Sequence, residues 1–354
     1  MDNVELRVYD KELTPLGVID EIASLLWTPT YWNEGTVGDL KLLAPMTENN
    51  KKLLVKGNIV VLHDGAADYT DETGNWRRGA QIRYRHITKD ANGAEQIEVQ
   101  GHFLKKWLSK RIILNKIVMT GTEQEKINRI VTENHGTGAA ARRQFKQFAM
   151  LTQEDLGGSS TEYANEDYVD AGKEIYNRAL AGKLGYDILI NENTRQYGFL
   201  LYKGRNLTSG NEEGNTPSIF SRDFDNVNEQ EYTESDEGQK NVMYATGAAD
   251  DNGAVPMVEV DRGGEGIDRD EVYVDMSSIS RKYTENEVEI TIPEAEYLKM
   301  LTAAAGTGLE DYQETVSFTA IINITSNLKY GEDFYLGDRV TCIATVSYTH
   351  LRAH

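Results

Sequence analysis

The alternation of apolar and polar residues is clearest between residues 79 and 114. Residues 82–87 alternate with the period that is typical of a half-buried β-strand, and residues 95–100 repeat the pattern. The Asn-Gly pair between these runs tolerates positive φ at low cost and predicts a hairpin turn. The apolar residues between 103 and 108 have helical spacing, so a short helix can cover the sheet. The segment therefore predicts one corner of a small antiparallel barrel.

Strand-like segments recur through the first 118 residues. About seven short strands are predicted, and their number and spacing favour a barrel or a sandwich. A brief helix is predicted over residues 48–55, with Thr47 as its N-cap and Gly57 as its stop. The predicted strands lie at 4–9, 18–27, 39–44, 58–63, 82–87, 95–100 and 111–114.

The remaining sequence mixes helices with strands. Thr122 and Glu125 form a capping box that predicts a helix start. Asp170 is the predicted N-cap of a second helix over 171–181, which should turn Leu180 inward. Further strands are predicted at 184–190, 196–202, 218–227, 239–247, 257–260, 272–276, 314–324 and 330–346.

These patterns predict a β-rich α+β fold in three parts. We expect a first β-barrel domain over 1–118, a mixed α+β domain over 119–205 and a second β-rich domain over 206–345. The third part should contain a helix over 292–305 that has Pro293 in its first turn, where a missing N–H costs nothing. Its path along the chain can be discontinuous.

Composition and charge exclude several classes of protein. No run of about 18 apolar residues predicts a membrane-spanning helix, and the N-terminus does not resemble a secretory signal. The single cysteine, Cys342, excludes an intrachain disulfide framework. Residues 1–150 have a net charge of +2 and residues 151–354 one of −22, giving −20 overall. So acidic a chain is a poor general binder of duplex DNA. Solubility is the favoured interpretation of its acidic surface, and repulsion of nucleic acid is the alternative.

The sequence contains no recognisable catalytic or metal-binding motif. The six histidines form no HExxH pair, and no GxSxG elbow, P-loop or dinucleotide fingerprint is present. Segment 261–271 does not fit the EF-hand pattern, because Gly263 and Glu265 take the third and fifth positions and Val272 follows at the twelfth. We therefore predict no catalytic, cofactor-binding or metal-ligating residues and no cofactor. The histidines and clustered carboxylates considered were His63, His86, His102, His135, His350, His354, Asp250, Asp251, Asp268, Asp270 and Glu271.

The four tryptophans are candidates for a carbohydrate platform. Trp107 belongs to the apolar face of the predicted short helix, so a position in the core is the better interpretation. Trp27 and Trp32 flank Pro29, which favours a packed barrel rim or a subunit contact. Trp76 follows a polar loop.

Beside these patterns, segments along nearly the whole chain resemble those of the siphovirus ReqiPepy6 Gp37-like family of phage and prophage tail proteins. None of them is a chemical signature by itself, but their order is fairly specific. They are VELRVYD (4–10), GVID (17–20), IRYRHIT (82–88), EVQGHFL (98–104), FSRDFDNV (220–227), GIDRDEVYVD (266–275) and YGEDFYLGD (330–338).

The resemblance implies a baseplate hub of the tail tip. Such hubs form homotrimers in which each subunit supplies two small antiparallel β-barrels, so that three chains make a ring extending the tail tube. The implied partners are the distal tail protein, the tail tube and the tape-measure protein. DNA would pass through the lumen without specific binding, and no membrane insertion is implied. Localisation would be the virion tail, after synthesis in the host cytoplasm.

The C-terminus departs from the family pattern. Residues 346–354 resemble translated sequencing-adapter sequence, so we expect this tail to be non-native and the final strands to be missing. Two other functions stay open. One is a host-surface module in which Trp27, Trp32 and the loop at 204–217 contact glycan, and the other is a tail-associated cell-wall hydrolase.

Overall fold

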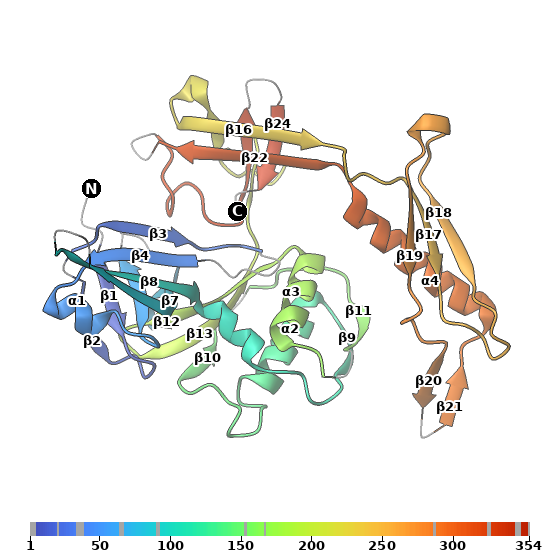
Figure 1. Cartoon of the computed structure of the whole chain (residues 1–354), viewed down its shortest axis with the longest axis horizontal. Helices are drawn as coiled ribbons and strands as arrows, with labels where there is room; N and C mark the ends of the chain where they lie inside the picture. Colours follow the sequence, from blue (N-terminus) through green and yellow to red (C-terminus); the bar gives the residue numbers. More distant parts are fainter. Residues whose placement is uncertain are drawn as a thin grey trace. The chain divides into compact units, whose positions relative to one another are not determined.

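The computed structural model divides the chain into two compact units (Figure 1). Unit 1 comprises residues 1–226 and 323–354, and unit 2 comprises residues 227–322. The domain boundaries predicted after residues 118 and 205 stay predictions. The structure describes residues 5–19, 21–32, 39–63, 67–89, 93–151, 154–165, 168–285, 288–323, 327–343 and 348–352.

The largest element of unit 1 is an eleven-stranded sheet. Seven of its strands follow the order β2-β1-β5-β7-β8-β4-β3, and every neighbouring pair in this series is antiparallel. These strands are β1 (Glu5–Tyr9), β2 (Pro15–Val18), β3 (Ser24–Thr28), β4 (Asp39–Pro45), β5 (Ile59–His63), β7 (Gly74–Lys89) and β8 (Glu95–Phe103). The short β6 (Tyr69–Asp71) pairs with the start of β7. The predicted hairpin at 82–100 is thus confirmed, while its turn at 90–92 lies outside the described residues.

The seven strands curl around one apolar core. Leu6 and Val60 from one end of the series share this core with Leu42 and Val99 from the other, and all four are completely buried. Helix α1 (Glu48–Leu53) adds the buried side chain of Leu53 to this core. Among the described residues β2 and β3 pair only with β1 and β4, so the curl has two free edges.

Strands β7 and β8 approach each other very closely at Gly101. A Cβ at Gly101 would lie 2.2 Å from the carbonyl oxygen of Gln81, so only glycine allows this approach. The pairing register shifts at the same place, between Ile82 and Tyr84. The sequence pattern predicts that the strand ends at Gly101, but β8 continues through it to Phe103.

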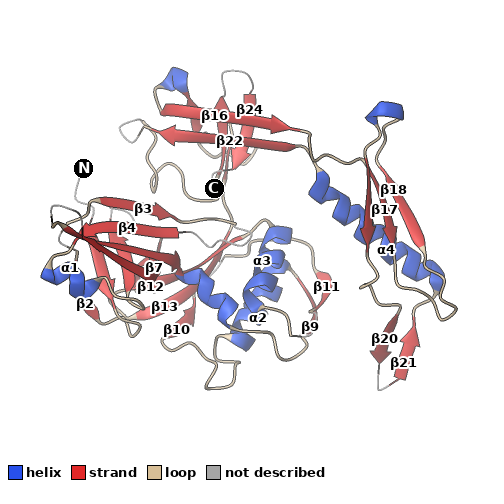
Figure 2. Cartoon of the chain, in the orientation of Figure 1, coloured by secondary structure: helices blue, strands red, loops and turns tan. Residues whose placement is uncertain are grey.

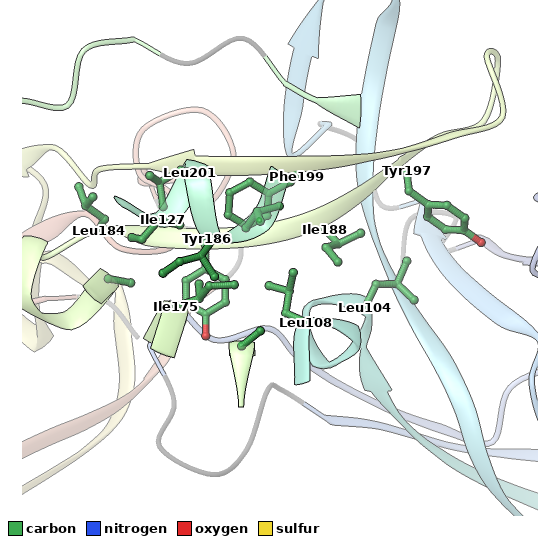
Figure 3. Packing of buried hydrophobic residues seen from close by; sticks show 14 of the residues in the cluster. Leu104, Leu108, Ile127, Ile175, Leu184, Tyr186, Ile188, Tyr197, Phe199 and Leu201 are labelled. Atoms are coloured by element: carbon green, nitrogen blue, oxygen red, sulfur yellow. The ribbon is translucent and has the colours of Figure 1, made fainter. Parts of the chain in front are cut away.

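A second core lies against the opposite face of β1 and β5, which contribute Tyr9, Ile59 and Val61. Figure 3 shows part of its packing. Strands β12 (Gly185–Asn191) and β13 (Gln196–Tyr202) form the predicted hairpin there, and every residue of β12 is buried. Three helices contribute to this core. They are α2 (Glu123–Asn134) with Ile127, α3 (Ala171–Gly182) with Ile175 and the 3₁₀ helix η1 (Leu104–Lys110) with Leu108. Completing this part are β9 (Val118–Gly121), β10 (Phe148–Met150) and β11 (Thr161–Ala164).

The helix starts predicted from local signals are present. The side chain of Thr122 accepts the Glu125 N–H, and the Glu125 carboxylate accepts the Thr122 N–H, which completes the capping box of α2. Asp170 caps α3 as predicted. The prediction that Leu180 faces inward is wrong, because its side chain is 45% exposed. The buried face of α3 contains Ile175 and Ala179 instead.

The last part of unit 1 is a four-stranded sheet in which parallel pairs occur. Strand β23 (Arg339–Ile343) runs parallel to β14 (Asn206–Leu207) and β15 (Ile219–Ser221) and antiparallel to β24 (Tyr348–Arg352). A 3₁₀ helix, η2 (Arg222–Phe224), follows β15. The predicted non-native tail overlaps β24, while its residues 346, 347, 353 and 354 lie outside the described part of the chain.

Unit 2 begins and ends with paired strands. The antiparallel ribbon joins β16 (Val227–Ser235) to β22 (Thr315–Ile322). Between them, α4 (Glu294–Gly308) packs Ala305 onto Met243 and Ala245 of a three-stranded sheet. That sheet has the order β18 (Met257–Asp261), β17 (Val242–Thr246), β19 (Glu271–Asp275). The unit is completed by η3 (Gly266–Asp268), β20 (Lys282–Glu285), β21 (Val288–Thr291) and η4 (Leu309–Tyr312).

Strand is the prevailing regular structure in both units (Figure 2), as the predicted β-rich α+β class requires. Two predictions need correction. The helix predicted over 292–305 starts at Glu294 and continues to Gly308, with Pro293 at the N-cap. The strand predicted at 111–114 is absent among the described residues. Only an isolated bridge forms there, between Ile112 and Asp170, and the pairing does not extend to their neighbours. In the same described ranges, no helix is long and apolar enough to cross a bilayer.

Candidate functional site around Tyr31

Three segments that are far apart in the sequence meet at Tyr31 in unit 1. The ring is completely buried, and a Cβ at either Gly185 or Gly337 would lie 2.2 Å from it. Its hydroxyl donates to the Lys183 carbonyl at 3.0 Å and accepts the Gly204 N–H at 3.3 Å. Tyr31 therefore ties the loop after β3 to β12 and to the segment before β23.

A buried ionic cluster lies next to this ring. The guanidinium of Arg78 donates from Nε to Asp187 at 2.6 Å and pairs through Nη1 with Asp68. Tyr202 accepts a further bond from Nη2 at 3.3 Å. Burial alone would lower the pKa of Arg78, but the negative charges of Asp68 and Asp187 hold that pKa well above its usual value. The guanidinium of Arg78 therefore keeps its positive charge although it is buried.

Lys105 adds a second buried cation. Its ammonium donates to the Thr30 carbonyl and lies 5.4 Å from the centre of the Tyr186 ring. Burial lowers the pKa of Lys105 to about 8, against the smaller raising effect of Asp187. The cluster therefore contains two cations, Arg78 and Lys105, and two carboxylates, Asp68 and Asp187.

The segment Tyr330–Asp338, here called the strap, is fastened by one carboxylate. Asp338 is 2% exposed and accepts the Arg205 backbone N–H at 2.7 Å and the Arg205 Nη2 at 2.6 Å. It also accepts the Tyr335 N–H at 2.9 Å. Arg205 in turn lies 5.1 Å from the Tyr335 ring centre. These bonds fix the strap against the end of β13.

Two cavities adjoin the strap, and we call them together the strap groove. The larger has a volume of about 740 Å³ and includes Trp27 and Trp32 in its wall. The smaller, of about 550 Å³, is bordered by the end of β13 and by Glu154. Both cavities share five lining residues, namely Asp68, Arg78, Tyr330, Tyr335 and Leu336.

The tryptophan predictions can now be compared with the structure. Trp107 packs against the second core, with its ring 5.1 Å from that of Tyr197. Trp27 packs edge-on against Phe103 at 4.8 Å, and Trp32 donates to the Leu184 carbonyl at 2.8 Å. Trp27 and Trp32 are therefore brought together at the strap groove, whereas the predicted loop at 204–217 supplies only Gly204 and Arg205 to its lining.

The histidines serve local packing. His135 is buried at the end of α2 and hydrogen bonds to the Leu108 carbonyl at 2.9 Å. His63 bonds to Glu192 at 3.0 Å, and His102 approaches Asp39 at 3.3 Å. His86 lies on β7, while the side chains of His350 and His354 lie outside the described part.

The clustered carboxylates also have structural partners. Asp250 accepts two backbone N–H groups of its own turn, and Asp251 lies 3.4 Å from Lys282. In the segment compared with an EF-hand, the guanidinium of Arg269 pairs with Asp261 and Glu271, each at 2.6 Å. Among the described residues, no group of three or more histidines, cysteines or carboxylates could hold a metal ion.

Sequence reasoning missed the residues that build this site. Tyr31, Arg78 and Asp338 belong to no motif, because their partners come from distant parts of the chain. Asp187 carries the one usable signal, since it interrupts an otherwise apolar strand. A carboxylate at such a position needs a buried cation as partner.

The fold is similar to that of solved tail proteins. The tail protein from Neisseria meningitidis MC58 aligns with a TM-score of 0.54 at 10% identity, over 98% of this chain and 89% of that one. The 43 kDa tail protein of prophage MuSo2 from Shewanella oneidensis aligns with a TM-score of 0.53 at 12% identity, over 98% and 91%. A search of curated protein sequences found no match.

The chain belongs to the siphovirus ReqiPepy6 Gp37-like protein family, whose profile matches residues 5–351. The resemblance inferred from the sequence is thus confirmed. The protein is a member of a phage tail protein family.

Proposed function

We propose that this protein is a subunit of the tail-tip hub, in which three copies form a ring that extends the tail tube. The observation that carries the proposal is the curled seven-stranded sheet, whose edges at β2 and β3 are free among the described residues. Exposed apolar side chains stand on these edges, including Leu16, Val18 and Leu26. Free edges of this kind are completed by strands of a neighbouring chain.

The two-barrel arrangement belongs to this proposal. The curled sheet would be the first barrel, and strands from 206 to 345 would supply the second one. In the ring, the distal tail protein, the tail tube and the tape-measure protein would be the neighbours. The protein would be synthesised in the host cytoplasm and reside in the virion tail without inserting into a membrane.

The charge distribution supports passive passage of DNA. Unit 2 contains 22 acidic and 6 basic residues, a net charge of −16 out of the −20 of the whole chain. An acidic wall repels phosphate, so DNA would slide past without specific binding. We also propose that the protein is not an enzyme, and the engagement of Asp250 in its own turn and of Glu271 in an ion pair with Arg269 supports this.

Mass measurement of the purified chain, alone and mixed with its distal tail protein, tests the trimer. We expect a species of three times 39.7 kDa. Leu26→Lys on the β3 edge should weaken the trimer at least tenfold, because it buries a charge at the edge contact. Met300→Lys, on the exposed side of α4, serves as the control. A chain that stays monomeric in both samples contradicts the proposal.

A further inference from the structure

The strap groove has the composition of a ligand site. The strap lays two exposed rings along it, since Tyr330 is 51% and Tyr335 37% exposed, and their centres are 6.3 Å apart. Trp27 and Trp32 add half-buried indole rings to the wall of the larger cavity. Aromatic rings in this arrangement offer flat apolar surfaces with polar groups at their edges.

The groove selects against a strongly charged ligand. Arg78 is neutralised by Asp68 and Asp187, and Arg205 is neutralised by Asp338. The lining also contains Arg77, Lys203 and Glu154, so four cations stand against four carboxylates when Asp187 is included. The ligand would therefore meet balanced charges, with hydrogen-bonding groups of both kinds along the wall. A nucleic acid would need an excess of cations instead.

The accessible hydroxyls of the wall suit a hydroxyl-bearing ligand. Thr28 lines the larger cavity and Thr70 lines the smaller one, and both residues are exposed. A hydroxyl both donates and accepts hydrogen bonds, so these groups match a ligand that carries hydroxyls of its own.

We propose that the strap groove binds a neutral oligosaccharide. Sugar rings have apolar faces that stack on tyrosine and tryptophan, and their hydroxyls both donate and accept hydrogen bonds. Two cavities of about 740 and 550 Å³ that share five lining residues suit a chain of several sugar units. This binding goes beyond the role in the hub and does not depend on the ring.

Titration of the full chain with neutral tetrasaccharides tests the proposal. The probes are the tetramers of N-acetylglucosamine, glucose and mannose, followed by calorimetry and by tryptophan fluorescence. We expect at least one tetramer to bind, to change the fluorescence, and to bind at least fivefold more weakly to Tyr330→Ala and to Tyr335→Ala. Tyr273→Ala, which removes a 62% exposed ring from unit 2, should bind as the parent does.

Thermal melting of each variant shows whether it is folded. Absence of binding by all three tetramers overturns the proposal, and so does binding that both strap variants retain. A proline-rich decapeptide is the competing probe, because aromatic grooves also bind such peptides. Binding of that peptide without any tetramer overturns the proposal in favour of peptide recognition. A monomeric protein that still binds a tetramer would contradict the hub and leave this site standing.

Discussion

The ring of Tyr31 is packed so closely that one added carbon atom beside it should lower stability. Gly337→Ala places a Cβ 2.2 Å from its ring, at a φ of +94° that L-residues rarely adopt. We expect the free energy of unfolding to fall by about 3 kcal/mol, from the clash and the backbone strain together. Denaturant unfolding of the purified variant measures the loss.

Gly214→Ala separates the two causes. Gly214 also has positive φ, at +75°, but no atom lies within 4 Å of the position that the new methyl group would take. This control should lose only about 1 kcal/mol, which is the cost of the backbone conformation. Equal losses in the two variants would show that the contact with Tyr31 is unimportant.

His135 predicts how stability depends on pH. Burial lowers the pKa of its imidazole to about 4, and Arg111 and Arg143 act in the same direction against the Leu108 hydrogen bond. The unfolded chain takes up this proton near pH 6.5, before the folded chain does. Stability contributed by neutral His135 is therefore complete above pH 6.5 and is lost as the pH falls toward 4.

Unfolding measured between pH 7 and 4 checks this expectation. The free energy of unfolding of the parent should fall by roughly 3 kcal/mol through His135 over this range. In His135→Gln this contribution should be missing, so the total fall should be smaller by the same amount. His86→Gln, at a position on β7 away from this core, should follow the parent. A pH profile that His135→Gln leaves unchanged would rule out His135 as the cause.

At the scale of elements, local signals were sufficient where they are self-contained. The capping box of Thr122 and Glu125 and the cap at Asp170 need partners within a few residues, so the sequence locates both helices. Alternation located β8, in which Ile97 and Val99 are buried on one face. It also located β7, although Tyr84 and His86 are exposed there. Strands β12 and β13 are buried on both faces, and their apolar runs on either side of a polar turn located them instead.

Other elements have no local signal. Strand β16 is polar along most of its length, and it forms because Gln230 and Tyr232 meet Ala320 and Phe318 across the ribbon. The candidate site was hidden for the same reason. Tyr31 contacts Gly337, and Arg205 contacts Asp338, across more than a hundred intervening residues. Sequence patterns report periodicity and caps, but they do not report such distant pairs.

At the scale of the whole molecule, unit 2 should fold by itself. It has its own core, in which Met243 and Ala245 are completely buried against Ala305 and Leu309. We expect a fragment of residues 227–322 to show β-rich circular dichroism and one cooperative melting transition. Amides of β17 should exchange more slowly than those of the ribbon, since a lone two-stranded ribbon is marginal in water.

A shorter fragment provides the control for this experiment. Residues 227–293 lack α4, which covers the apolar face of the three-stranded sheet, and this fragment should not melt cooperatively. If residues 227–322 also remain unfolded, unit 2 requires the rest of the chain.

The ribbon of β16 and β22 has a consequence for how such proteins diversify. The chain leaves unit 1 after Asn226 and returns at Asn323, and the two connecting strands are hydrogen bonded to each other along their length. Unit 2 is therefore an inserted cassette, meaning a segment whose first and last residues lie next to each other. Recombination between related genomes could exchange that cassette whole, and the recipient would keep its reading frame and its scaffold as long as the two flanking strands still match.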